Sequence, residues 1–256
     1  MDLTSLVKSK RVLVTGASSG LGAHFARLFA RCGAHLAIAA RRIDKLEQFA
    51  DELRALGAAS VMPVAMDVTD AESVQQAFLT MSNQAPLLDI VINNAGISGE
   101  GLALQQSVDQ FDEVIATNLR GVWLVAKQAA SIWKDAARSG TIVNIASIQG
   151  ERVAPGLSAY SASKAAVVHL TRNLALEWAR YDIRVNALEP GYIRTEINSD
   201  LWEQDYGKEM IRRIPMRRLG RPEDLDGALL LMASSASSWM TGSILAIDGG
   251  HLVSAL

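Results

Sequence analysis

The stretch RVLVTGASSGLG, Arg11–Gly22, decides the fold of this chain. Its first five residues form a β-branched apolar run, which predicts a buried strand. Three glycines follow, and Ala23–Cys32 then has the apolar periodicity of a helix. Gly16 permits a tight turn, Gly22 permits close packing, and the helix N-terminus offers free N–H groups to a pyrophosphate. The spacing is G-x-x-x-G-x-G rather than G-x-G-x-x-G, and in this context it predicts a dinucleotide site.

The end of the second predicted strand, His35–Ala40, carries information about the cofactor. An acidic residue there would hold the ribose 2′-hydroxyl of NAD, whereas an arginine accommodates the 2′-phosphate of NADP. Here Ala40 is followed by Arg41 and Arg42, whose guanidiniums can form forked hydrogen bonds to a phosphate. The sequence therefore favours NADP(H), with NAD(H) possible. The simpler alternative is that these arginines begin the next helix as solvated charges.

Five further apolar runs predict strands: Val61–Val68, Leu88–Ile92, Thr141–Ser147, Ile183–Leu188 and Ser243–Ile247. Helical patterns separate them: Asp44–Leu56, a segment opened by a capping box at Thr69–Glu72, a segment from Ser107 to about Ala137, a long helix within Ala154–Arg180, and one from Pro222 to about Ala233. This alternation predicts an α/β fold, a Rossmann-type, doubly wound parallel sheet of about seven strands with helices on both faces. No linker interrupts it, so we expect residues 1–256 to form a single domain.

Polar residues and glycines follow most of these strands. In a doubly wound sheet, ligands bind beyond the carboxyl ends of the strands. We therefore expect one edge of the molecule to gather the residues at those ends: Gly16, Arg41, Asp67, Asn93, Ser147 and Pro190.

Tyr160 and Lys164 lie four residues apart at the start of the long helix, on one helix face. A phenol has an ordinary pKa of about 10, and a nearby ammonium favours the phenolate and lowers that pKa. The pair is a candidate proton donor and acceptor. Taken alone, the same spacing is typical of an ordinary helix surface.

Together these motifs resemble the short-chain dehydrogenase/reductase family over almost the whole chain. The matching residues are Thr15, Gly16, Gly20, Gly22, Asp67, Asn93-Asn94-Ala95-Gly96, Asn118, Ser147, Tyr160, Lys164, Pro190-Gly191 and Thr195. In style and length the sequence is most similar to 3-oxoacyl-carrier-protein reductases and to small-alcohol or sugar dehydrogenases.

The resemblance implies a role for each catalytic position. Tyr160 would exchange a proton with the substrate oxygen, and Lys164 would hold the nicotinamide ribose and lower the pKa of Tyr160. Ser147 would hydrogen-bond the substrate oxygen, and Asn118 would support a water that links Lys164 to solvent. The simpler alternatives are that Asn118 merely bonds backbone and that Ser147 is a helix N-cap or turn residue.

The cofactor site implied by the turn, the strand ends and the resemblance is larger. Asp67 would meet the adenine, Asn94 would lie along the cofactor, and Thr195 would help to fix the carboxamide, although Asn93–Gly96 could be only a turn. The full predicted set is Gly16, Ser18, Ser19, Gly20, Leu21, Gly22, Arg41, Arg42, Asp67, Val68, Asn94, Ala95, Gly96, Tyr160, Lys164, Pro190, Gly191, Ile193 and Thr195.

Glu189 departs from the family pattern, in which the residue before Pro190-Gly191 is small or weakly polar. We expect it to pair with a nearby arginine, Arg194 being the closest in sequence, rather than to touch substrate.

The predicted substrate residues are Ser147, Gln149, Tyr160, Tyr192 and Trp202, with 192–218 as a lid segment. Trp202 serves equally well as an anchor that fixes this segment to the core. Arg152 or Arg194 could serve an acidic substrate, but a solvated surface charge is the simpler interpretation.

Composition narrows the function classes. A net charge of −2 argues against a nucleic-acid surface, and no apolar run approaches a membrane span. The one cysteine, Cys32, permits no internal disulfide and fits a reducing, cytoplasmic setting. The four histidines show no metal-ligand spacing. Surplus apolar residues on the helices, together with the resemblance, predict a homotetramer or a homodimer.

We therefore expect an NADPH-dependent reductase that converts a ketone or 3-oxo substrate into a secondary alcohol, reversibly, with Tyr160 as general acid/base. An NAD-dependent alcohol or sugar dehydrogenase is the nearest alternative. A non-catalytic nucleotide-binding protein is the alternative of another class.

Overall fold

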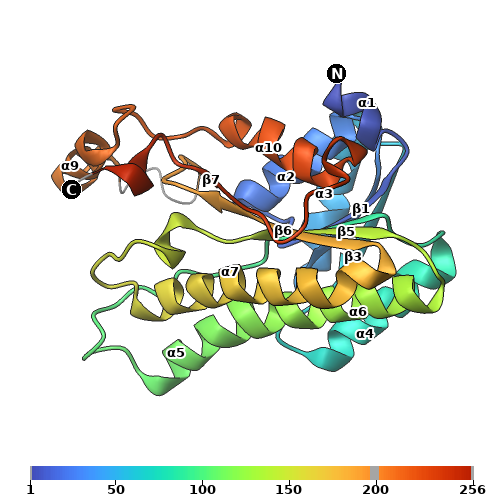
Figure 1. Ribbon diagram of the computed structural model, residues 1–256, viewed down its shortest axis with the longest axis horizontal. Helices are drawn as coiled ribbons and strands as arrows, with labels where there is room; N and C mark the ends of the chain where they lie inside the picture. Colours follow the sequence, from blue (N-terminus) through green and yellow to red (C-terminus); the bar gives the residue numbers. More distant parts are fainter. Residues whose placement is uncertain (1, 197–201, 255–256) are drawn as a thin grey trace.

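The computed structural model describes residues 2–196 and 202–254 (Figure 1). Within them, seven strands form one sheet in the order β3-β2-β1-β4-β5-β6-β7, and every pairing is parallel. The strands are β1 (Arg11–Thr15), β2 (His35–Ala40), β3 (Ser60–Ala65), β4 (Ile90–Asn93), β5 (Gly140–Ile145), β6 (Ile183–Pro190) and β7 (Ile244–Ile247). The predicted doubly wound sheet is confirmed.

Helices cover both faces of the sheet (Figure 1). One face carries α1 (Leu3–Val7), α2 (Gly20–Arg31), α3 (Ile43–Ala55) and α10 (Asp226–Ala233). The other carries α4 (Ala71–Gln84), α5 (Val108–Ile115), α6 (Gly121–Asp135) and α7 (Ser158–Trp178), while α9 (Asp205–Arg213) lies beyond the sheet. Short turns of helix complete the chain: η1 (Ala116–Arg120), η2 (Ile148–Gly150), η3 (Ala179–Tyr181), η4 (Pro222–Leu225), η5 (Ser235–Ser237) and η6 (His251–Val253).

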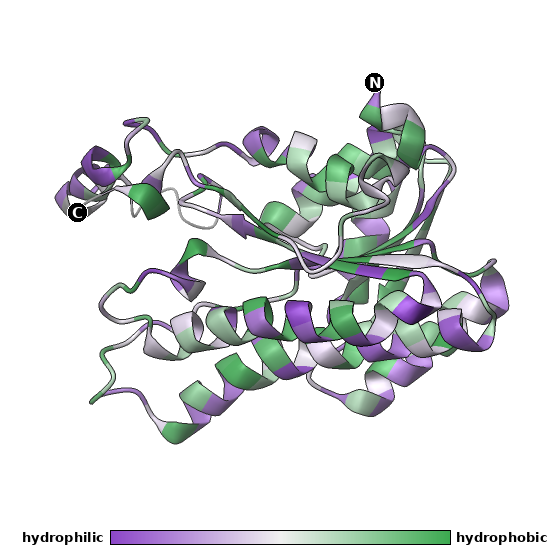
Figure 2. Ribbon diagram, viewed as in Figure 1, coloured by the Kyte–Doolittle hydropathy of each residue, from purple (hydrophilic) through white to green (hydrophobic). Residues whose placement is uncertain are grey.

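Two hydrophobic cores follow from the alternation of side chains along each strand. On β1, Val12 and Val14 pack in the core with Phe25 of α2. Leu13, between them, packs in the opposite core with Trp133 of α6. Figure 2 shows apolar residues along the sheet and mixed apolar and polar faces on the helices below it. Full burial of a side chain such as Phe25 stabilises the fold by roughly 1.5–3 kcal/mol.

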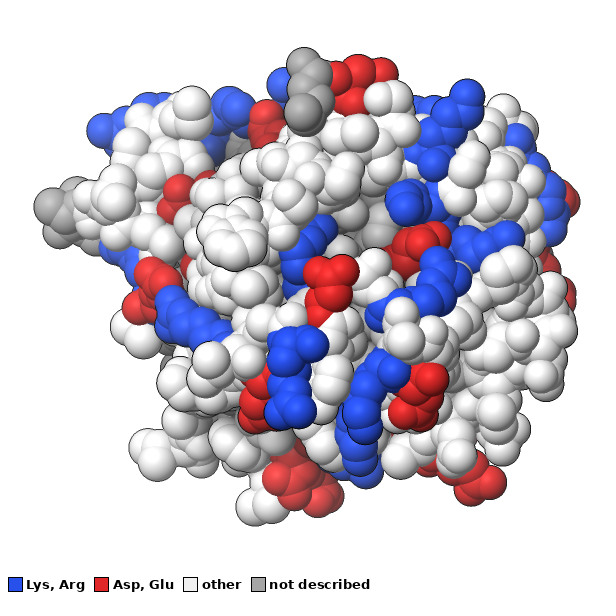
Figure 3. Space-filling model, turned by 45° about the vertical axis from the view of Figure 1, so that its right-hand side comes forward, with Lys and Arg blue, Asp and Glu red and all other residues white. Residues whose placement is uncertain are grey.

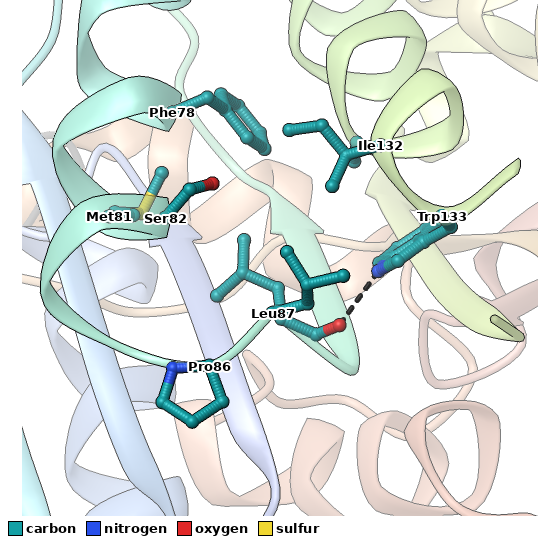
Figure 4. Close-up of a pocket in the computed structure, with 9 residues that line it drawn as sticks. Phe78, Met81, Ser82, Pro86, Leu87, Ile132 and Trp133 are labelled. Atoms are coloured by element: carbon teal, nitrogen blue, oxygen red, sulfur yellow. Dashed lines mark hydrogen bonds between the residues drawn. The ribbon is translucent and has the colours of Figure 1, made fainter. Parts of the chain in front are cut away.

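Trp133 ties the C-terminal part of α6 to the segment that leads into β4 (Figure 4). Its Nε1 donates a 2.7 Å hydrogen bond to the carbonyl of Leu88. A Cβ on Gly140 would approach the Trp133 ring to 2.2 Å, so this strand start must be glycine. The neighbouring hollow between Phe78 and Ile132 is apolar and has a volume of about 10 Å³, roughly the size of one water. It does not accommodate a substrate.

Several boundaries differ by a few residues from the sequence-based expectation, and three of the differences have a clear physical reason. The α4 helix is capped by Asp70, which accepts from the Glu72 amide, and Thr69 instead donates to Asp67. The β3 strand ends at Ala65, two residues before Asp67, because Asp67 is held in the turn by Thr69 and Ser73. The segment from Ser107 begins with the predicted capping box to Gln110, but it is interrupted by a π-helical turn, η1.

The order of the strands reverses between β1 and β4, which pair directly although β2 and β3 intervene in the chain. The connections after these two strands therefore diverge to opposite sides and leave a crevice at their carboxyl ends. This crevice lies where the glycine-rich turn follows β1.

The surface carries charges of both signs, interspersed over the face seen in Figure 3. Among residues 2–196 and 202–254, no helix is long and apolar enough to cross a membrane.

Candidate active site

A cleft of about 320 Å³ opens at the carboxyl ends of β1, β2, β3 and β4. Twelve of the predicted cofactor residues line it: Gly16, Ser18, Ser19, Gly20, Leu21, Arg41, Arg42, Asp67, Val68, Asn94, Ala95 and Gly96. Its walls also include residues that the sequence-based prediction missed: Ala39, Ala40, Met66, Thr69, Ile97, Glu113 and Thr117. Most of these have no chemical signature of their own, and only their position beside a strand end could have indicated them.

The glycine-rich turn has the geometry that its sequence predicts. Gly16 has φ +65°, a left-handed conformation that side chains disfavour. A Cβ on Gly22 would lie 2.2 Å from the Gly16 carbonyl oxygen, so only glycine allows the helix to pack this closely. The amide of Gly20, at the start of α2, donates a 3.0 Å hydrogen bond to the Glu196 carboxylate. A carboxylate of the protein itself, that of Glu196, thus occupies the N-terminus of α2.

Asn94 holds this turn in place from β4. Its Nδ2 donates to the carbonyl of Thr15 at 3.0 Å, while the amides of Asn94 and Ala95 both donate to the Thr15 hydroxyl. The Asn94 side chain therefore stabilises the turn, in agreement with the alternative that the motif is structural. A contact along the cofactor stays a prediction.

Arg41 and Asp67 face each other across the cleft end. Burial raises the pKa of Asp67, but hydrogen bonds from Thr69 and the charge of Arg41 outweigh it, and the net pKa lies below its usual range. Asp67 is therefore an ionised acceptor at neutral pH. Arg41 and Arg42 are both exposed at the end of β2.

Tyr160, Ser147 and Lys164 meet between α7 and the end of β5. The Ser147 hydroxyl hydrogen-bonds the Tyr160 phenol. The Lys164 Nζ donates to the Ile145 carbonyl at 2.7 Å, and it would lie 3.6 Å from a Cβ on Gly96, a residue of the cleft wall. The structure thus places the three side chains together and beside the cleft.

The predicted lowering of the Tyr160 pKa by Lys164 is not observed. Burial raises the pKa of the phenol, and the hydrogen bond with Ser147 opposes this only in part. The Lys164 Nζ lies 5.6 Å from the ring centroid and is engaged by a backbone carbonyl. Burial lowers the pKa of Lys164 itself to about 8. Desolvation outweighs the attraction that the helical spacing predicted.

Asn118 lies in the π-helical turn η1 and is fully buried. Its Oδ1 accepts from the Ile97 amide at 2.8 Å, and its Nδ2 donates to the Ile97 carbonyl and to Ser163. It therefore ties the loop after β4 to α7, next to Lys164. The simpler alternative for Asn118 was that it only bonds backbone, and it does bond the backbone of Ile97, which is distant in the sequence. Its support of a water next to Lys164 stays a prediction.

Ser147 also caps η2, since its Oγ accepts from the Gln149 amide at 3.2 Å. Gln149 Nε2 in turn donates to the Tyr192 hydroxyl at 3.1 Å. Trp202 is buried in a small cluster with Ile214 and meets the Tyr192 ring edge-on at 5.3 Å. Trp202 thus anchors the segment, as the alternative expected, and its contact with substrate stays a prediction.

The remaining predicted residues lie farther along the edge. Pro190 ends β6, while Gly191 and Ile193 line a separate hollow with Asp248. Thr195 is half-buried and is followed by Glu196, the last residue of the first described range. Residues 197–201 of the predicted lid segment lie outside the described residues.

The expected pairing of Glu189 with Arg194 is wrong. Glu189 is 1% exposed and Arg194 is exposed, and within residues 2–196 and 202–254 no ion pair joins them. Glu189 Oε1 is buried without a hydrogen-bond partner. Its pKa is raised to about 7, chiefly by burial; the charges of Glu151 and Asp248 add to the rise, and that of Arg172 opposes it.

The cleft, the tyrosine–serine–lysine cluster and the doubly wound sheet together define a nicotinamide-dependent oxidoreductase. The chain belongs to the short-chain dehydrogenase/reductase superfamily, and the family model described as enoyl-(acyl carrier protein) reductase matches residues 16–251. It is an NAD(P)-dependent oxidoreductase that acts on CH–OH groups.

Three relatives make the placement concrete. Gluconate 5-dehydrogenase of Gluconobacter oxydans (strain 621H) is 36% identical and covers 99% of this chain and 98% of its own. A short-chain type dehydrogenase/reductase from Mycobacterium marinum has a TM-score of 0.91 at 41% identity, with 98% and 99% covered. A gluconate 5-dehydrogenase from Burkholderia cenocepacia J2315, in complex with NADP and tartrate, has a TM-score of 0.93 at 32% identity, with 99% of each chain covered.

Proposed function

We propose that this protein interconverts a ketone and a secondary alcohol with NADP(H), and that reduction is the favoured direction. The observation that carries the proposal is the half-buried Tyr160 phenol, hydrogen-bonded to Ser147 beside the Lys164 ammonium at the cleft wall. The bound nicotinamide would supply or accept the hydride; the protein supplies orientation and proton transfer.

Tyr160 serves as the proton donor. Because the pKa of the phenol is raised, it carries its proton at neutral pH, the form that protonates a developing alkoxide. Ser147 adds a second donor already in place. Lys164 is protonated below about pH 8, and its ammonium lies 5.6 Å from the centroid of the Tyr160 ring. Asn118 helps to position Lys164, because its hydrogen bonds fix η1 against the loop at Ile97.

The cleft suits a dinucleotide phosphate. Its glycines leave room that a Cβ would fill, as at Gly16, where one would meet Ala95 at 2.8 Å. The Gly20 amide points at an anion, and no carboxylate follows Ala40 at the end of β2. Arg41 and Arg42 line the same cleft. The NADP in the Burkholderia cenocepacia relative supports the preference for NADP(H).

An NAD-dependent sugar or alcohol dehydrogenase is the second candidate. The name of the Gluconobacter oxydans relative favours a dehydrogenase of a sugar acid. Arg41 in place of a carboxylate argues against NAD as the preferred cofactor.

We also propose a homotetramer that buries the apolar residues left on the outer helices. Leu176 of α7 is 81% exposed and Trp123 of α6 is 38% exposed. Light scattering at micromolar concentration is expected to give four chains, and a monomer would contradict the proposal.

The test of the proposed chemistry is Tyr160→Phe, with Tyr181→Phe as the matched control. Loss of the phenol hydroxyl is expected to lower kcat by about 10²–10⁴-fold, while NADPH binding, measured by fluorescence, persists. Tyr181 contacts Lys134 and Arg180 and lines no part of the cleft in the described residues, so its variant should keep activity. Equal activity of Tyr160→Phe and the wild type would refute the assignment.

A further inference from the structure

A fully buried hydroxyl lies between the two functional side chains at the start of α7. Ser163 directly precedes Lys164, and none of its surface is exposed. Its Oγ donates a 2.6 Å hydrogen bond to the backbone carbonyl of Tyr160 and accepts a 3.1 Å hydrogen bond from Asn118 Nδ2. The hydroxyl thus joins the backbone of the candidate proton donor to a side chain of another element, η1.

The direction of these hydrogen bonds is set by the partners of Asn118. Its Oδ1 accepts from the amide of Ile97 at 2.8 Å, and its Nδ2 donates to the carbonyl of Ile97 and to Ser163. Turning the Asn118 amide over would set acceptor against acceptor at that carbonyl. Because Ser163 receives a proton from Asn118, it directs its own proton to Tyr160. Every polar group in this chain has a partner, which gives the arrangement a single geometry.

The π-helical turn that carries Asn118 is itself fixed to the cofactor cleft. Ile97, which bonds Asn118 twice, lines the cleft. Gly121, the residue after the turn, packs against Val68 of the cleft wall, and a Cβ there would lie 2.9 Å from Val68 Cγ2. Single π-helical turns inside helices are frequent at functional sites. A continuous line of contacts therefore leads from the cleft wall, through this turn, to α7.

Tyr160 needs such an anchor because of its place in the helix. The α7 helix begins at Ser158, so Tyr160 lies in the first turn. The N-cap residue is Leu157, whose side chain cannot accept a hydrogen bond from the free amides. The hydrogen bond from Ser163 to the Tyr160 carbonyl holds this first turn from within the protein.

An equivalent hydroxyl on the same helix serves as a comparison. Thr171 is also fully buried, and its Oγ1 donates to the Val167 carbonyl at 2.8 Å and accepts from Asn144 Nδ2 at 2.9 Å. It lies about two helical turns beyond Lys164. The bonding pattern is the same, but only the hydroxyl of Ser163 ends on the backbone of Tyr160.

We propose that Ser163 is a positioning residue that fixes Tyr160 relative to the cofactor cleft. The proposal rests on the proposed function, because it gives Ser163 a part in the proton transfer assigned to Tyr160. Ser163 is fully buried and acts through the backbone, without contact with substrate. A displacement of about 1 Å at a reacting group can cost about a hundredfold in rate, so loss of this anchor should slow the reaction.

The kinetic test compares Ser163→Ala with Thr171→Val, in which an equivalent hydroxyl is lost. Both are assayed with NADPH on a panel of small ketones and 3-oxo esters. Ser163→Ala is expected to lower kcat by about tenfold and to change the KM for NADPH by less than about twofold. Thr171→Val is expected to keep kcat within about twofold of the wild type. Urea unfolding of both variants is expected to show similar losses of stability, so stability does not explain the difference in kcat.

A second measurement does not depend on turnover. The ¹³Cζ resonance of Tyr160 is recorded at pH 7 in protein with labelled tyrosine and is assigned with Tyr160→Phe. It is expected to move in Ser163→Ala, because the phenol shifts relative to Ser147, and to stay in place in Thr171→Val.

Unchanged kcat in Ser163→Ala, or equal losses of kcat in the two variants, would overturn the positioning role. So would a Tyr160 resonance that is the same in Ser163→Ala and the wild type. With turnover intact, these results refute the positioning alone. A resonance that moves only in Ser163→Ala, in a protein that turns over no carbonyl or alcohol, supports the positioning and refutes the proposed function.

Discussion

Replacing Glu189 with glutamine should change how the stability of the protein depends on pH. Glu189 is the penultimate residue of β6, and one of its carboxylate oxygens is buried without a hydrogen-bond partner. Burial raises its pKa from 4.5 to about 7. In the unfolded chain the carboxyl ionises near its ordinary pKa, whereas in the folded protein it keeps its proton to about pH 7.

The magnitude follows from linkage. Between about pH 4.5 and pH 7 the unfolded state releases a proton that the folded state retains, so stability falls as the pH rises. At about 1.36 kcal/mol for each unit of pKa, the whole effect is about 3 kcal/mol, of which about 2.5 kcal/mol falls between pH 5 and pH 8. Below the ordinary pKa both states are protonated and the effect vanishes. Glutamine has no such proton, so its variant lacks this decline.

Urea unfolding at pH 5, 6, 7 and 8, at one protein concentration, measures the difference. The free energy of unfolding of Glu189→Gln, relative to the wild type, should rise by about 2.5 kcal/mol from pH 5 to pH 8. A buried amide without a partner lowers stability equally at every pH, so only the slope is diagnostic. Glu177→Gln, at an exposed position on α7, controls for the loss of a negative charge. Parallel curves for Glu189→Gln and the wild type would refute the reasoning.

Three further outcomes are expected. Arg41→Asp should lower the ratio of catalytic efficiency with NADPH to that with NADH by about tenfold to a hundredfold, and an unchanged ratio would contradict the cofactor assignment. Glu196→Gln should tighten NADPH binding, measured by fluorescence titration, by roughly two- to fivefold, because a charged competitor leaves the Gly20 amide at the helix N-terminus; weaker binding would show that the carboxylate assists instead. Gly140→Ala forces a Cβ into the Trp133 ring and should lower the urea unfolding free energy by about 1–3 kcal/mol, while Gly227→Ala, with open space around it, should not destabilise.

Much of the site was accessible from the sequence because its signals are local. Glycines at Gly16 and Gly22 are required by turn geometry and close packing within one strand-turn-helix unit. The alternation of strands and helices dictates parallel pairing and brings the strand ends to one edge. The position of Arg41 directly after a predicted strand was enough to assign it to the cleft wall, and the structure places it there.

The parts that failed depend on contacts between segments far apart in the chain. The Glu196 carboxylate reaches Gly20 across 176 residues, and no local pattern indicates that contact. Glu189 was expected to pair with its neighbour in sequence, but β6 carries it into the interior while Arg194 stays at the surface.

The amino-acid order by itself determined the doubly wound sheet and the glycine turn, because periodicity and backbone conformation are properties of short stretches. The candidate catalytic residues came from the resemblance to a known family. Only the tertiary structure decided the pKa of Tyr160, the buried and unpartnered oxygen of Glu189 and the anchoring of Trp202. Desolvation and polar satisfaction sum over every segment packed around a group, and a linear sequence does not state which segments those are.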